Sequence, residues 1–375
     1  MTKCLALILA DDRGEKLGSL TMYNSKPAVN FGVNRRIIDF ALNNCAASGV
    51  DTIGVLSQYF SDDLHKYISG AYSNNGLYML PAYLTGQLYS GTADAVFKNM
   101  RFIDRFNPEF VLILRGDQVY EMDYRKIVNY HETTRAAVTE ATRQTVNGAR
   151  TSRAPMGVYV FNWDAMKKYL ILDAKNEKSS HDLDADVLPA MRRAEEPVNA
   201  YHFKGYWRGI DTIESLWEAN MELLDKKSSE GFAWTPDHCV NSDNKYYLMK
   251  PLANLDAAYA RILVSGIVEH SILGDSVMVL PGAEVVNSIV MPNAYIGNNV
   301  RIYNAIIGPG ASIMDNTVIG DNFGTDFFVE PDLCTGGVSL VEPGLYIPKD
   351  LSIKSGSHID NAMLAEWEEF NRISA

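Results

Sequence analysis

The sequence predicts an α/β domain with a mostly parallel sheet, followed by a parallel β-helix. Two observations predict this order. Short apolar runs of strand length alternate with segments of helical spacing in the first part of the chain, and ten aliphatic residues then recur at intervals of six and five between Ile267 and Ile319. The chain has 375 residues, which is long enough for two domains that each bury a core.

The α/β part is predicted from runs that stop abruptly at polar residues. Residues 3–10 form an apolar run after Lys3 that ends at Asp11, as a buried parallel strand does where it enters a loop, and residues 50–57 and 110–114 form similar runs. Residues 36–48 have helical spacing of apolar side chains. Ligands of an open parallel sheet bind at the carboxyl ends of its strands, so residues 11–16, Gln58 and 116–117 are candidate site positions.

The β-helix is predicted from a hexapeptide repeat that follows a polar connector. We expect an α/β domain at 1–224, a connector at 225–260 and the β-helix domain at 261–375. Glycines directly follow three of the repeat positions, as in a left-handed β-helix; an ordinary sandwich would instead need alternation with a period of two. The repeat positions are Ile267, Leu273, Val279, Val285, Val290, Ile296, Ile302, Ile307, Ile313 and Ile319.

Beyond the repeat, residues 361–373 predict a terminal helix. Met363, Trp367 and Phe370 would lie on one side of it and pack against a neighbouring surface.

Composition and charge exclude several classes of protein. The chain is 47% hydrophobic and 21% charged, which excludes disordered and fibrous chains. Its formal net charge of −12 disfavours nucleic acid and anionic membrane surfaces as partners. The four cysteines have no CxxC spacing, and the sequence shows neither a leader nor an apolar stretch long enough to span a membrane. A reducing cytoplasm is therefore expected.

Several short segments, in this order, identify a family. They are 26–29 (KPAV), 36–45 (RIIDFALNNC), 58–59 (QY), 89–95 (YSGTADA), 116–124 (GDQVYEMDY), 156–161 (MGVYVF), 205–207 (GYW) and 212–221 (TIESLWEANM). Over nearly its whole length the chain resembles glucose-1-phosphate adenylyltransferase, also called ADP-glucose pyrophosphorylase. The resemblance implies a Rossmann-like nucleotidyltransferase domain with a left-handed β-helix. It also implies Mg²⁺-assisted attack of glucose 1-phosphate on the α-phosphorus of ATP, in glycogen synthesis.

The nucleotide loop departs from the family pattern. The family has Gly-Gly-x-Gly-x-Arg, because glycine lets backbone N–H groups close on the triphosphate. Residues 11–16 here read DDRGEK, so two carboxylates would repel ATP unless they turn outward or recruit a cation. The positions that the resemblance assigns to the nucleotide are Gly14, Lys16, Gln58, Gly91 and Thr92.

The metal site is also incomplete. Of the family's two catalytic aspartates, one is retained as Asp117, followed by Gln118 in place of histidine, and the other position is Gly209. Asp211 would point to the same side about 6–7 Å further along the chain, too far for Mg²⁺ bonds of about 2.1 Å. The resemblance implies Mg²⁺ as cofactor, and the lost ligand predicts that this chain binds it poorly.

The sugar-phosphate and effector sites are reduced as well. Glu140 to Arg153 replaces several dozen residues that carry the family's phosphate-gripping lysine, and no lysine occurs between 126 and 167. Lys26, Tyr89 and Gly157 match sugar-phosphate positions, although Lys26 and Tyr89 could equally serve structure. Arg36 matches an effector position, while other effector cations are missing.

The leading hypothesis is a catalytically impaired, regulatory or structural subunit. It would form a tetramer with a catalytic glucose-1-phosphate adenylyltransferase subunit, with itself, or with both, and could still hold ATP or ADP-glucose. The alternatives are an active nucleotidyltransferase with a rebuilt pocket, a scaffold or ligand sensor, and a hexapeptide acyltransferase. The acyltransferase is disfavoured because the repeat region offers only His270 as a base.

Overall fold

The computed structural model describes residues 4–33, 35–72, 76–147, 150–224, 239–242, 245–249, 264–323 and 327–374. It divides into two compact units. The first comprises Met1–Arg13, Asn24–Ala28 and Ile37–Trp207, and the second comprises Gly14–Tyr23, Val29–Arg36 and Arg208–Ala375. Three segments before residue 225 thus belong to the second unit. The predicted boundaries at 224 and 260 stay a prediction, and most of the expected connector lies outside the described residues.

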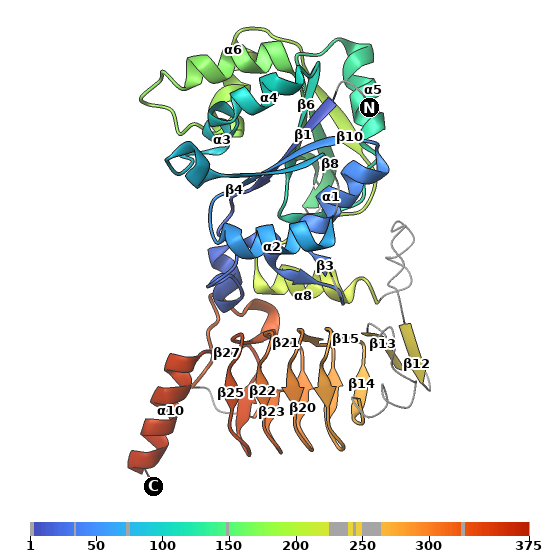
Figure 1. Ribbon diagram of the computed structural model, residues 1–375. Helices are drawn as coiled ribbons and strands as arrows, with labels where there is room; N and C mark the ends of the chain where they lie inside the picture. The colour runs from blue at the N-terminus through green and yellow to red at the C-terminus, as the bar shows by residue number, and fades with distance from the viewer. Residues whose placement is uncertain are drawn as a thin grey trace. The chain divides into compact units, whose positions relative to one another are not determined.

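The first unit is built on a seven-stranded sheet in the order β10-β8-β9-β6-β1-β4-β5 (Figure 1). Its strands are β1 (Cys4–Ala10), β4 (Thr52–Ser57), β5 (Leu77–Pro81), β6 (Phe110–Arg115), β8 (Val138–Asn147), β9 (Arg150–Asn162) and β10 (Val198–Phe203). β1 runs parallel to β4 and β6, β4 to β5, and β8 to β10, whereas β9 is antiparallel to both neighbours. The predicted mostly parallel sheet is confirmed.

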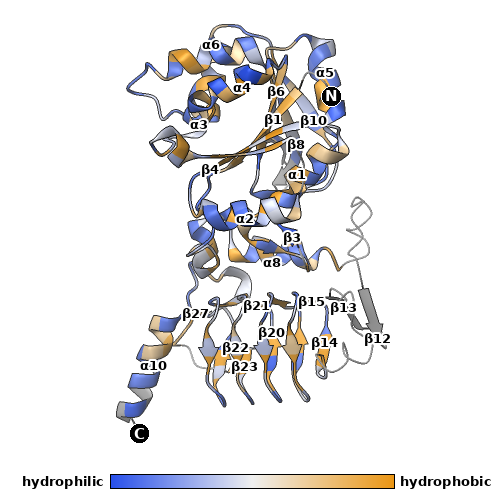
Figure 2. Ribbon diagram, viewed as in Figure 1, coloured by the Kyte–Doolittle hydropathy of each residue, from blue (hydrophilic) through white to orange (hydrophobic). Residues whose placement is uncertain are grey.

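Helices cover both faces of this sheet because its strands are apolar on both sides. Ala6 and Ile8 of β1 pack in one core with the helices that begin at Ile38, Ser61 and Tyr124, and Leu5 and Leu7 pack in the other with the helices that begin at Thr92, Met100 and Trp163. The hydrophobic colour of the central strands in Figure 2 agrees with this double burial. The helices are α1 (Ile38–Ala47), α2 (Ser61–Ala71), α3 (Thr92–Lys98), α4 (Met100–Phe106), α5 (Tyr124–Thr134), α6 (Trp163–Asp173) and α7 (Leu188–Arg193).

The described residues of the segment 140–153, which the resemblance indicates to be shortened, belong to two antiparallel strands. β8 and β9 pair from Thr142 opposite Pro155 to Asn147 opposite Arg150, with a register shift between Glu140 and Thr142. Apart from that shift, the described residues of the shortened segment pair in one antiparallel ladder.

The second unit contains a parallel β-helix, consistent with the predicted left-handed form. Its strands stack in three sheets, as the repeated coils in Figure 1 show. One sheet contains β12 (Cys239–Ser242), β13 (Lys245–Met249), β15 (Ser271–Leu273), β18 (Ile289–Val290), β21 (Ala305–Ile307), β24 (Ser339–Val341) and β27 (His358–Ile359). The second contains β14 (Ile267–Glu269), β17 (Glu284–Val286), β20 (Arg301–Tyr303), β23 (Val318–Asp321) and β26 (Ser352–Lys354); the third contains β16 (Met278–Val279), β19 (Tyr295–Ile296), β22 (Ser312–Ile313) and β25 (Tyr346–Ile347).

Nine of the ten predicted repeat positions are fully buried inside the coil, and one prediction is wrong. Ile267 is 49% exposed, and Val268 takes its place at 4% exposure. The strand pairing explains this, because Val268 lies opposite Val285, which in turn lies opposite Ile302. Side chains that stack between coils must share one register, so a shift by one residue turns Ile267 outward.

The remaining elements of the second unit include α8 (Ile213–Met221) and α10 (Asn361–Ser374). The terminal helix is thus confirmed. Met363 and Trp367 pack against the β-helix core as predicted, while the side chain of Phe370 lies outside the described set. Short strands β2 (Asn30–Phe31) and β3 (Arg35–Arg36) form an antiparallel pair.

Within the described ranges, no helix is long and apolar enough to cross a membrane. Cys4, Cys45 and Cys334 are buried free thiols, and burial raises the pKa of Cys4 to about 12. Cys239 has no described side chain.

Candidate functional site

The retained aspartate, Asp117, lies just past the carboxyl end of β6 and is only 2% exposed. Both of its carboxylate oxygens accept hydrogen bonds. Arg115 donates to Oδ1 through Nε at 2.9 Å and to Oδ2 through a terminal nitrogen at 2.6 Å, and Lys26 Nζ donates to Oδ2 at 2.9 Å. Burial opposes ionisation, but the hydrogen bonds and charges of Arg115 and Lys26 outweigh it and hold the pKa of Asp117 well below its usual range.

The acidic loop after β1 takes part in the same network. Asp12 Oδ2 lies 3.2 Å from Lys26 Nζ and 3.6 Å from a terminal nitrogen of Arg115. The pKa of Asp11 is raised, chiefly by burial, and the nearby charges of Asp117 and Asp12 add to that effect. We call Asp11, Asp12, Lys26, Arg115 and Asp117 the charge cluster. Of the two alternatives to repulsion, an outward turn or the recruitment of a cation, Asp12 shows the second. The cations that it binds are Lys26 and Arg115 of the same chain.

Gly157 on β9 creates the space that Arg115 occupies. Its φ of +68° lies in the left-handed region, and a Cβ there would lie 2.5 Å from Cδ of Arg115. The resemblance assigns Gly157 to the sugar phosphate. In the structure it lies against the aliphatic part of the Arg115 side chain, whose guanidinium binds Asp117. Sequence reasoning missed Arg115. The sequence feature that could have identified it is the position of Arg115 at the end of an otherwise apolar strand, directly before Gly116-Asp117.

Tyr89 is a packed residue in this structure. It is 6% exposed, its hydroxyl donates to the Leu80 carbonyl at 3.0 Å, and Asn99 Nδ2 donates to that hydroxyl at 3.0 Å. Burial raises its pKa. The Tyr89 backbone N–H donates to the side-chain oxygen of Gln58, so Gln58 positions this turn. The structure thus supports the packing alternative for Tyr89.

Gly91 and Thr92 hold a neighbouring loop in place. A Cβ on Gly91 would lie 2.4 Å from the carbonyl oxygen of His181, so the close approach requires glycine. The Thr92 hydroxyl donates to Asp182 Oδ2 and accepts from the Leu183 N–H, both at 2.8 Å. These contacts give both residues a structural role, while their assignment to a nucleotide stays a prediction.

The other predicted positions lie in the second unit. Gly14 has φ 72° and precedes the short helix Glu15–Thr21, on which Lys16 is exposed. Arg36 is half-buried in β3, and Gly209 ends β11 (Trp207–Gly209). Their assigned roles in nucleotide, effector and metal binding remain untested predictions.

His270, the base considered for an acyltransferase, also lies in the second unit. Its Nδ1 lies 2.8 Å from Asn287 Oδ1, a structural contact between coils.

The residues present do not fit a magnesium site. A bound Mg²⁺ needs oxygen ligands with free lone pairs, but both oxygens of Asp117 face cationic donors of the chain itself. Among the described residues, no group of three or more His, Cys, Asp or Glu side chains is placed to hold a metal ion.

Comparison with known proteins gives the family. The family model for nucleotidyl transferase matches residues 5–153 and 147–226, and the model for a GlmU-like C-terminal hexapeptide matches 257–341. Glucose-1-phosphate adenylyltransferase of Bacillus cytotoxicus is 38% identical over 364 residues, which cover 86% of this chain and 96% of that enzyme. The chain belongs to the glucose-1-phosphate adenylyltransferase family. The Bacillus mycoides and Geobacillus stearothermophilus enzymes of that name are also 38% identical, over 84% and 76% of this chain and 90% and 83% of their own lengths.

This member of the glucose-1-phosphate adenylyltransferase family keeps the scaffold, but Lys26 and Arg115 of the chain itself form ion pairs with the retained Asp117. Lys26 and Asp117 are two retained site residues that the structure brings together; their side chains are 4% and 3% exposed and bind one another. Gln118, which follows the aspartate, accepts a hydrogen bond from Trp207 Nε1 at 3.0 Å. The first unit therefore holds a closed polar network where the family resemblance places substrate phosphates.

Proposed function

We propose that this chain is a catalytically impaired subunit of glucose-1-phosphate adenylyltransferase that assembles with a catalytic subunit, in the cytoplasm, and modulates ADP-glucose formation for glycogen. The observation that carries the proposal is the charge cluster. Both oxygens of the buried Asp117 accept hydrogen bonds from Arg115, and Lys26 donates to Oδ2 of Asp117 and pairs with Asp12.

The electrostatics explain why such a centre would work poorly. Transfer of a nucleotidyl group brings two anions together and needs cations or backbone donors aimed at them. Lys26 and Arg115 instead neutralise Asp12 and Asp117. A charge pair at about 4 Å is worth about 4 kcal/mol at a surface-like dielectric, so the two loop carboxylates, even with Asp12 partly offset by Lys26 and Arg115, would lower ATP affinity by at least about tenfold.

The first test is pyrophosphate exchange into ADP-glucose by the purified chain alone at millimolar Mg²⁺. We expect no exchange above background. Exchange at the rate of the Bacillus cytotoxicus relative, assayed in parallel, would overturn the proposal. That outcome would favour an active enzyme with a rebuilt pocket.

A second test removes the repulsion and measures ATP binding by calorimetry. The double variant Asp11→Asn/Asp12→Asn should bind ATP at least tenfold more tightly than the parent, because it removes two carboxylates and releases cations toward the phosphate. The matched control is Asp62→Asn/Asp63→Asn, which changes two adjacent exposed acids in the first turn of α2. Equal affinity in all three proteins would contradict the electrostatic argument.

The subunit role is tested by co-expression with a complete catalytic subunit. We expect the two chains to co-elute as a tetramer on a sizing column, and the effector response of the mixture to differ from that of the catalytic subunit alone. Separate elution together with an unchanged response would refute the regulatory role.

A further inference from the structure

Arg115 contacts carboxylates from two different loops of the first unit. One terminal nitrogen of its guanidinium lies 2.6 Å from Asp117 Oδ2 and 3.6 Å from Asp12 Oδ2, and its Nε donates to Asp117 Oδ1 at 2.9 Å. Asp12 follows β1 and Asp117 follows β6, and these two strands are neighbours in the sheet. The guanidinium therefore joins the two acids across the sheet, as a metal ion does when it binds two carboxylates.

The fold provides space for this guanidinium. Gly157 on β9 has a φ of +68°, and a Cβ there would lie 2.5 Å from Cδ and 2.8 Å from Cγ of Arg115. The Arg115 side chain is only 35% exposed although it ends in a permanent charge. The missing Cβ and the paired acids together hold the guanidinium in one place, so Arg115 is a fixed part of the charge cluster.

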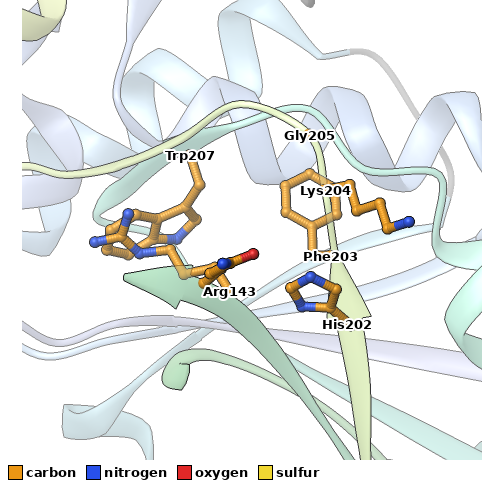
Figure 3. A pocket seen from close by; sticks show the side chains of 7 residues that line it. Arg143, His202, Phe203, Lys204, Gly205 and Trp207 are labelled. Atoms are coloured by element: carbon orange, nitrogen blue, oxygen red, sulfur yellow. The ribbon is translucent and has the colours of Figure 1, made fainter. Parts of the chain in front are cut away.

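Another arginine of the first unit is held in a different way. The guanidinium carbon of Arg143 lies 4.1 Å from the ring centroid of Trp207, and both residues line a pocket (Figure 3). None of the described residues that line this pocket is acidic. Arg143 therefore packs on an aromatic ring, whereas Arg115 neutralises carboxylates. Removal of Arg115, in contrast to removal of Arg143, would leave acids behind without their cation.

The acids around Arg115 are not the pair that the family resemblance implies. Asp117 is retained and Gly209 takes the second family position, but Asp12 adds a carboxylate where the family loop has glycine. Carboxylates suit Mg²⁺ and Mn²⁺, and Mg²⁺ in proteins is commonly held by one or two of them together with water. The charge cluster has three carboxyl groups against two cations. Without Arg115 it would have three against one, an excess that a divalent cation can balance.

We propose that the guanidinium of Arg115 takes the place of a divalent cation and masks a metal site formed by Asp12 and Asp117. This accounts for the poor fit of the parent chain to a magnesium ion, and it assigns that poor fit to Arg115 as well as to the lost acid at Gly209. The inference rests on the charge cluster, as the proposed function does. It concerns metal binding alone, so it is tested without turnover and without a second subunit.

Titration of the full chain with Mn²⁺, followed by the EPR signal of the free ion, tests the proposal. We expect Arg115→Ala to bind one Mn²⁺ per chain at least about tenfold more tightly than the parent chain. Adding Asp12→Asn to Arg115→Ala should abolish this gain, because one of the two ligands is lost. Arg125→Ala is the matched control. Arg125 also donates twice to an aspartate two residues away, at 2.8 Å and 2.9 Å to Asp123, but this pair is exposed, so its loss should leave Mn²⁺ binding unchanged.

The proposal is overturned if the parent chain binds Mn²⁺ as tightly as Arg115→Ala does, or if folded Arg115→Ala binds none at millimolar concentration. A gain that Arg125→Ala shares, or that persists when Asp12→Asn is added, would also overturn it. If Arg115→Ala loses its native circular dichroism, Arg115→Gln decides, because glutamine keeps part of the side-chain volume and removes the charge. Absence of Mn²⁺ binding would leave the subunit proposal standing, since pyrophosphate exchange and co-elution test that proposal separately.

Discussion

Replacing Lys26 with methionine tests whether the charge cluster stabilises the folded first unit. Lys26 Nζ lies 2.9 Å from Asp117 Oδ2, and the two side chains are 4% and 3% exposed. Removing one partner of a buried pair costs about 3–5 kcal/mol, because the other charge stays desolvated. Arg115 still donates to Asp117, so we expect the lower end, a loss of about 3 kcal/mol in the free energy of unfolding.

The assay is urea unfolding, followed by a probe in the first unit, with Lys167→Met as the control. Lys167 pairs with Asp104 at 2.6 Å, but the side chains are 35% and 40% exposed, so its loss should cost less than about 1 kcal/mol. The double variant Lys26→Met/Asp117→Asn should recover at least about 1.5 kcal/mol, because the buried negative charge is gone. Equal costs for Lys26→Met and Lys167→Met, or no recovery in the double variant, would refute the reasoning.

Three further predictions concern stability. Gly157→Ala should destabilise the protein by about 1–3 kcal/mol in urea unfolding, since alanine is strained at φ +68° and its Cβ would clash with Arg115; an unchanged midpoint would contradict this. Ile302→Ala should cost about 2–5 kcal/mol, whereas Ile267→Ala, at a side chain 49% exposed, should change stability by less than about 0.5 kcal/mol; equal losses would restore the register predicted from the sequence. Burial lowers the pKa of His131 to about 4. The neutral imidazole therefore contributes stability that is fully present above the unfolded pKa of about 6.5 and is lost as the pH falls toward 4. His131→Gln should flatten that part of a curve of stability against pH, and an unaltered slope would contradict this prediction.

The sequence alone was sufficient where the pattern is local and repeated. Apolar residues at intervals of six and five predicted the β-helix, because each coil stacks on the next and its inward positions must be aliphatic. The one wrong position, Ile267, lies in β14, the first strand of its sheet, where only pairing with the following coil reveals that Val268 is the buried residue.

Tertiary structure alone decided the state of the candidate site. The sequence placed Asp117 at a strand end and marked Lys26 as a cation with two possible roles, but these residues are 91 positions apart. Whether they face a ligand or one another depends on the path of the chain. The same holds for Arg115, which fits beside Asp117 only because Gly157 on an adjacent strand lacks a side chain. Periodicity reports which way a residue faces within its own strand or helix, whereas ion pairing depends on distances across the sheet, which only the folded chain sets.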